Sequence, residues 1–163
     1  MAKMALDESG RKYLVEIGLE PVGNRAILVE YTPNDNLGDK LAHFFSSETY
    51  ILQMCKNELV LFPMHMRVVA GTVAYYSLEN KVALQLSYSS IQSVEITEKG
   101  TNYMVSITTD TDTIRLLSPK KWVGAFMGAT GRWHMNNMDD TLQMLKSLQA
   151  NVAGLKHPMK NTL

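Results

Sequence analysis

The chain has 163 residues, enough for one hydrophobic core and at most a small extension beside it. Hydrophobic residues make up 45% of the sequence and charged residues 20%, which is the composition of a folded globular protein. Lys+Arg 16 balance Asp+Glu 16, and this net charge of zero argues against a protein whose main task is to bind nucleic acid.

The first predicted elements lie in residues 1–47, which we expect to form a short N-terminal α/β extension. Residues 13–31 contain two apolar runs around Pro21 and Gly23, a pattern typical of a hairpin. Apolar residues then recur at helical spacing over 37–46, which predicts a short helix.

From Thr49 onward, short apolar runs alternate with turn residues at close intervals, which is typical of an antiparallel sheet or barrel. The turns are rich in Asn, Gly and Asp, which tolerate turn dihedrals. Alternation within the runs predicts one buried face and one solvent face. We expect seven strands, over residues 49–55, 58–64, 67–77, 81–87, 90–97, 102–109 and 113–118.

Helical signals follow the last predicted strand. Ser118 and Pro119 have the residue types of a helix start, and Asn137 offers a second start. Apolar residues then repeat every three or four positions, which predicts an amphipathic helix that ends at Gly154 and is followed by a flexible tail over 154–163. The apolar stripe consists of Met138, Leu142, Leu145, Leu148 and Val152.

This order of elements resembles that of pleckstrin-homology (PH) barrels, in which a C-terminal helix closes one end of the barrel. The segment "LSYSSIQSVEI" at 86–96 is similar to the strand rhythm of bacterial PH-like and GRAM-like domains. The resemblance covers a PH-like domain over residues 48–153. It implies an α+β, mainly β fold: a seven-stranded antiparallel barrel, or a pair of orthogonal sheets, with a C-terminal amphipathic helix. Because functions vary widely across this fold, it implies no particular activity.

The stretch "SPKKWVGAFMGATGRWHMNN" at 118–137 lacks the residues of a Walker A loop and the glycine spacing of a dinucleotide-binding fingerprint. In a functional interpretation, Lys120, Lys121 and Arg132 form a basic rim beside Trp133 that binds a membrane surface or an acidic peptide. In a structural interpretation the stretch is a hinge between strand and helix. Its tryptophans then lie in the core and one glycine, Gly131, caps a short helix.

No residues are arranged for catalysis or metal binding in the sequence, so we expect no enzymatic activity, no cofactor and no metal. The histidines lack zinc-binding spacing, and each is expected to be a partly exposed polar residue. Cys55, the single cysteine, is expected to be buried and unreactive, because only Lys56 is placed in sequence to lower its pKa. The four histidines are His43, His65, His134 and His157.

We expect a cytoplasmic adapter that binds another protein. A single cysteine requires no oxidising compartment, and neither a secretory signal nor a membrane span is apparent. Pro63 in "FPMHMR" predicts a loop or a bend in an edge strand. At an exposed edge there, a partner strand or a second copy of the chain can add.

Three other functions stay open. An anionic membrane surface is a possible partner of the basic rim, although the zero net charge favours a protein. An enzyme with an unrecognised site is the second alternative. Nucleic-acid binding, through the basic rim and stacking on Tyr75, Tyr76 or Trp133, ranks last.

Overall fold

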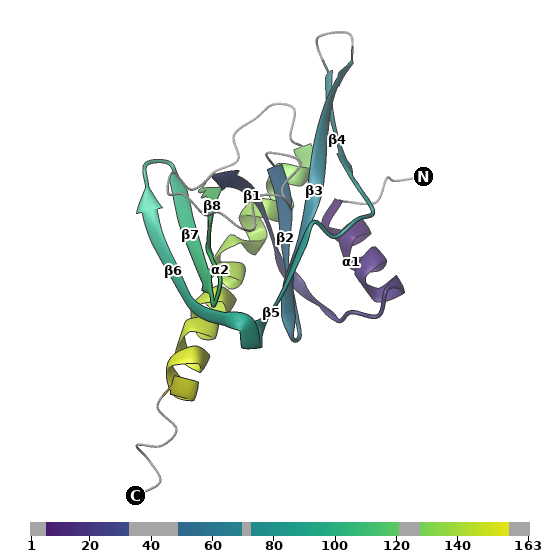
Figure 1. Ribbon diagram of the computed structural model, residues 1–163. Helices are drawn as coiled ribbons and strands as arrows, with labels where there is room; N and C mark the ends of the chain where they lie inside the picture. Colours follow the sequence, from purple (N-terminus) through teal and green to yellow (C-terminus); the bar gives the residue numbers. More distant parts are fainter. Residues whose placement is uncertain (1–5, 33–48, 70–72, 121–127, 157–163) are drawn as a thin grey trace, which may run out of the picture.

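The computed structural model describes residues 6–32, 49–69, 73–120 and 128–156. The expected mainly β, antiparallel fold with a C-terminal helix is confirmed (Figure 1), but the described residues form eight strands rather than seven, in one open sheet. The elements are α1 (Leu6–Glu16), β1 (Pro21–Thr32), β2 (Thr49–Cys55), β3 (Glu58–Val69), β4 (Val73–Leu78), β5 (Leu84–Ser87), the 3₁₀ turn η2 (Tyr88–Ser90), β6 (Ile91–Lys99), β7 (Asn102–Thr109), β8 (Thr113–Pro119) and α2 (Gly128–Lys156).

The additional strand is β1, and it lies in the middle of the sheet. The strand order is β4-β3-β2-β1-β8-β7-β6, with β5 paired to β3. β1 pairs with β2 along Ala26 to Glu30 and with β8 only at Glu30 to Thr32. Residues 1–47 thus supply β1, the strand that joins two antiparallel meanders. The domain boundary expected between residues 47 and 48 lies between β1 and β2 in the chain, and these two strands pair with each other.

The hairpin expected over residues 13–31 is wrong, because its first apolar run belongs to α1. Leu14 from this run is fully buried on one side of the helix. The helix ends at Glu16. Two residues later Gly18 has a positive φ of 93°, which glycine readily adopts, and the Leu19 amide donates to the Leu14 carbonyl at 2.8 Å. The short helix expected over 37–46 lies outside the described residues.

The expected edge-strand bend at Pro63 is also wrong, since Pro63 lies within β3, whose neighbours are β2, β4 and β5. β3 pairs with β5 from Glu58 to Leu61 and with β4 from Met64 to Val69. Pro63 therefore lies in the interval between these two pairings. There its carbonyl accepts a hydrogen bond from the amide of Glu79 at 3.2 Å. A residue without an N–H is tolerated at this break in the ladder.

The helix starts predicted at Ser118 and Asn137 are wrong. Ser118 and Pro119 end β8, and α2 begins at Gly128 and continues beyond Gly154 to Lys156. Gly131 lies inside α2 and does not cap a helix. The polar side chains that resemble caps are used for tertiary contacts instead: Ser118 Oγ donates to the Leu28 carbonyl at 2.7 Å. The hinge residues 121–127 lie outside the described part of the chain.

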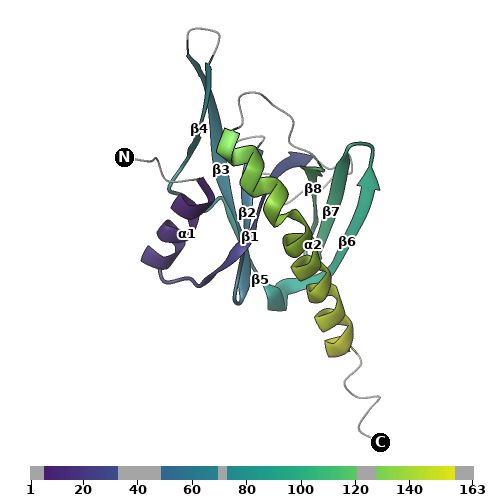
Figure 2. The ribbon, with the colours of Figure 1, turned by 180° about the vertical axis from the view of Figure 1, so that it is seen from behind.

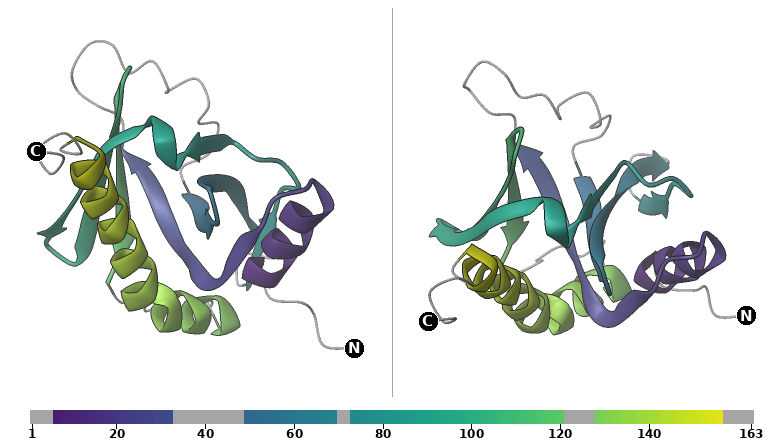
Figure 3. Two further views of the ribbon diagram at one scale, coloured as in Figure 1. Left: turned by 90° about the horizontal axis from the view of Figure 1, so that it is seen from below. Right: turned by 60° about the horizontal axis from the view of Figure 1, so that its bottom comes forward.

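Two hydrophobic clusters lie on opposite faces of the strands, which we call the inner and outer faces. On β1, Ile27 and Val29 belong to the inner cluster, whereas Ala26 and Leu28 belong to the outer one. Figures 2 and 3 show α2 running across the sheet, with α1 on the other side of β1. The outer cluster includes α1 and Trp133 of α2, and the inner cluster is covered by the later part of α2.

Candidate interaction surface

The outer edge of β6 is the end of the sheet. In the described part of the chain β6 pairs only with β7, and Figure 1 shows it as the outermost strand of its meander. The β6–β7 ladder is irregular between Ile91 and Ser93 but regular from Ser93 to Lys99. A regular strand with one unpaired side presents a row of backbone N–H and C=O groups to another chain.

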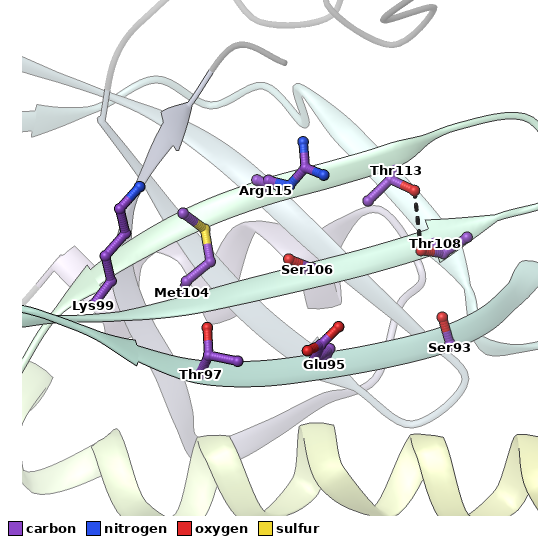
Figure 4. Close-up of a pocket in the computed structure, with 9 residues that line it drawn as sticks. All are labelled: Ser93, Glu95, Thr97, Lys99, Met104, Ser106, Thr108, Thr113 and Arg115. Atoms are coloured by element: carbon purple, nitrogen blue, oxygen red, sulfur yellow. Dashed lines mark hydrogen bonds between the residues drawn. The ribbon is translucent and has the colours of Figure 1, made fainter. Parts of the chain in front are cut away.

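The two faces of β6 differ in chemistry because alternate side chains point to opposite sides of a strand. Val94 is buried in the inner cluster, and Ile96 packs against it. The outer face carries only polar side chains (Figure 4), and in the order of the chain these are Ser93, Glu95, Thr97 and Lys99.

A groove of ≈ 370 Å³ lies between the β6–β7 hairpin and α2. Ile96 and Tyr103 line its sheet side. The α2 side is lined by Asp139, Leu142, Gln143 and Lys146, whose spacing of three and four residues places them on one side of the helix. The groove therefore combines an apolar floor with an acidic and a basic side chain, next to the open edge of β6.

A second, more polar hollow of ≈ 470 Å³ lies on the outer face of β6, β7 and β8 (Figure 4). Glu95, Ser106 and Arg115 form one row across the three strands, as their pairings require. In a neighbouring row, Thr108 of β7 lies opposite Thr113 of β8, and their hydroxyl oxygens are 3.0 Å apart. No described helix covers these strands on this face, so apart from Met104 the side chains that line the hollow are hydroxyls and charges.

The residues predicted for the basic rim are placed as follows. The Lys120 ammonium lies 2.9 Å from Glu98 and 5.3 Å from the centre of the Tyr103 ring. Arg132 is exposed on α2, and Trp133 is 9% exposed within the outer cluster. Lys121 lies outside the described residues. The described contacts of Lys120 are therefore to the β6–β7 hairpin, and those of Trp133 are to the core.

The expectation that each histidine is partly exposed is wrong for His134, which is fully buried. Its Nδ1 accepts the Leu28 N–H at 3.0 Å, and its Nε2 donates to the Pro119 carbonyl at 2.8 Å. Burial lowers the pKa of His134 below its usual 6.5, against the opposing effect of the Pro119 carbonyl. The imidazole is thus neutral, with its proton on Nε2.

These contacts compensate for the early separation of β8 from β1. β1 and β8 pair from Glu30 to Thr32 but not on the N-terminal side of Glu30, so Leu28 and Ala26 lack strand partners on the side of β8. Ser118 Oγ donates to the Leu28 carbonyl, and His134 Nδ1 accepts the Leu28 N–H. Asn137 Nδ2 donates to the Ala26 carbonyl at 3.1 Å. Side chains of β8 and α2 replace a ladder here, a role that spacing in the sequence does not reveal.

Cys55 is buried, as expected. Burial first, and the carboxylate of Glu58 second, raise the pKa of its thiol to about 12. The hydroxyl of Tyr88 donates to the Cys55 carbonyl, and burial raises the Tyr88 pKa as well. A thiol with so high a pKa is protonated at neutral pH and is a poor nucleophile.

Metal-binding clusters and membrane-spanning helices are both absent from the described residues. No three His, Cys, Asp or Glu side chains in this part of the chain are grouped so that they could hold a metal ion. None of its helices has the length and hydrophobicity needed to cross a membrane.

Comparison with known proteins adds no relative: no family model matches the chain, and no curated protein matches it in sequence.

The open edge of β6 and its adjoining groove were not predicted from the sequence. The run "SIQSVEIT" predicts a strand, but only the pairing of the whole sheet places that strand at an edge.

Proposed function

We propose that the protein is a non-enzymatic binding module that takes an extended segment of a partner protein as an added strand on β6. The observation that carries this proposal is the unpaired outer edge of β6 beside the groove at α2. Backbone hydrogen bonds along such an edge supply affinity, and alternate side chains of the added strand enter neighbouring grooves and supply specificity.

A PH-like architecture is part of this proposal. It is supported by the order of the strands, in which one antiparallel meander (β1 to β4) is joined to another (β6 to β8) through the first and last strands. It is also supported by α2, which packs its apolar side on the inner cluster. A cytoplasmic location is likewise proposed, and the single, buried Cys55 is in keeping with it.

A protein partner is preferred to an anionic membrane because of the charges around the groove. Lys120, one member of the proposed basic rim, is already paired with Glu98, and Asp139 accompanies Lys146 in the groove. Such mixed charge suits a peptide that carries both signs, whereas a membrane surface attracts clusters of basic residues.

The proposal is tested with peptides selected from a random display library against the purified protein. Binding of a selected peptide to isotope-labelled protein should shift the amide resonances of β6 and of residues 139–146. The substitution Gln143→Arg, which places a large charged side chain in the groove, should weaken binding about tenfold. Asn136→Arg lies on the same side of α2, two turns earlier and outside the groove, and should leave binding unchanged.

Selected peptides that bind elsewhere on the protein, or that tolerate Gln143→Arg as well as Asn136→Arg, would contradict this function. Co-sedimentation with vesicles of anionic lipid, but not with neutral vesicles, would favour the membrane alternative instead. A steep loss of that binding with added salt would identify it as electrostatic.

A further inference from the structure

We infer that the strand which β6 accepts is β6 of a second copy of this chain, so that two subunits form a symmetric dimer with one continuous sheet. The inference rests on the proposed function, because it names the partner for the same edge. It is carried by the order of charges along the outer face of β6.

Glu95 and Lys99 lie on this face at equal distances in sequence from Thr97 (Figure 4). Four residues of extended strand separate them by about 13 Å, so the two side chains cannot pair within one strand. Ser106 and Asn102 of β7 lie opposite them on the paired side, and neither of these residues is charged. On the unpaired side, an incoming strand can supply a charge of the opposite sign to each.

An antiparallel copy of β6 supplies both charges in one register. A two-fold axis at Thr97 places Glu95 opposite Lys99 of the partner subunit, and symmetry repeats the pair on the other side of the axis. Directly opposed residues of paired strands share one face, so the polar outer face continues across the junction.

Neighbouring registers lack this match. An axis at Glu95 opposes two glutamates, which is destabilising. An axis at Ile96 places Glu95 opposite Thr97 of the partner subunit and leaves Lys99 opposite Ser93 of the partner subunit, so no opposite charges meet. The register at Thr97 is therefore favoured by charge.

The remaining charges near the junction do not oppose this register. It places Glu98 opposite Ile96 of the partner subunit on the inner face, where the carboxylate is already held by Lys120 at 2.9 Å. Arg115 lies two strands away from the edge, in the same row as Glu95. In the groove, Asp139 and Lys146 are of opposite sign.

Sedimentation equilibrium of the full chain and of two charge-reversal variants tests the inference. The wild type should dimerise in a concentration-dependent way. Glu95→Lys and Lys99→Glu each replace two attractive pairs by two repulsive ones, and should each raise the dimer Kd about tenfold or more. Mixing the two variants should restore association, because the two substituted positions then face each other with opposite charges and the original pair is retained on the other side of the axis.

Lys81→Glu serves as the control, since it makes the same charge change as Lys99→Glu at an exposed position away from β6. It should leave the dimer Kd at the wild-type value. Thermal unfolding of all three variants followed by circular dichroism checks that each is folded, so that lost association reflects the junction.

Association that survives either reversal, or a mixture of the two variants that stays monomeric, would overturn the inference. A wild-type chain that is monomeric while library peptides still bind to β6 would overturn the dimer and leave the proposed function standing. A monomeric wild type whose β6 also binds no peptide would overturn both.

Discussion

The strands β1 to β3 and the strands β6 to β8 are parts of one sheet, but they are covered differently. In the first set both faces are packed: residues 26–29 and 50–55 are buried without interruption. In the second set buried residues are interrupted by exposed or half-buried ones, and in β8 every second residue is buried. Strands buried on both faces need continuous apolar runs, whereas strands with one open face alternate.

This difference separates two tasks within a small protein. The first set, held between the two clusters, contributes more buried hydrophobic residues to the fold than the second set does. The second set contributes its inner face to the core, and no described helix covers its outer face, while the last strand, β6, is paired on one side only. Substitutions on the same face of the sheet should therefore have very different effects in the two regions.

The largest contrast is expected on the outer face. Ile51→Ala, in β2, removes a buried side chain from the outer cluster and should lower the free energy of unfolding by about 3 kcal/mol. Ser106→Ala, on the outer face of β7, should change it by less than about 0.5 kcal/mol. Urea unfolding of both variants measures this contrast, and equal effects would show that the outer face is packed alike in both regions.

A smaller effect is expected from His134→Ala, which acts where the two sets of strands separate. The substitution leaves the Leu28 amide without an acceptor and the Pro119 carbonyl without its donor. At neutral pH it should lower the free energy of unfolding by about 2 kcal/mol. A variant as stable as the wild type would mean that water or another side chain satisfies these groups equally well.

The contribution of His134 should also depend on pH. Because its pKa is lower in the folded state than its usual 6.5, the unfolded chain binds a proton more readily. The stabilisation is therefore complete above about pH 6.5 and declines as the pH falls toward the folded-state pKa, by at most about 1.4 kcal/mol per pH unit. The difference in unfolding free energy between wild type and His134→Ala should shrink accordingly, whereas a pH-independent difference would contradict this assignment.

The smallest effect is expected at the turn that ends β6. Gly100 has a positive φ of 60°, and a Cβ added there would meet no atom within 4 Å. Gly100→Ala should therefore cost about 1 kcal/mol from backbone strain alone. Gly23→Ala, at a position with equal space but no positive φ, should be neutral or slightly stabilising in the same thermal unfolding measurement.

Much of the open part of the sheet could be predicted from the sequence, because there each strand carries its own alternating pattern and ends at a turn. In this part the strand over 102–109 has the predicted bounds, and β8 extends only one residue beyond its prediction. In the packed part, the strand over 49–55 also has its predicted bounds, because its apolar run ends at a turn. The alternation in β7 was less regular than expected, since Met104 is buried together with Val105 and Ile107.

What could not be predicted depends on contacts between distant segments. The apolar run at Ala26 to Val29 shows that a strand is buried, but not that it lies between β2 and β8. Pro63 suggested an edge strand because proline has no N–H to donate to a neighbouring strand. In the structure this missing donor is accommodated inside the sheet, where β3 changes partner from β5 to β4. His134 and Asn137 have the residue types of surface or capping positions, and only the divergence of β8 from β1 explains their burial.

The side-chain contacts that complete β1 also have a consequence for the order of folding. Leu28 and His134 are 106 residues apart, and Ala26 and Asn137 are 111 residues apart. During synthesis, β1 can pair with β2 as soon as residue 55 has left the ribosome, but its other side waits for β8 and α2. The closing of this long loop is expected to be the slow step of folding, and until it is complete β1 is an unpaired edge open to misassociation.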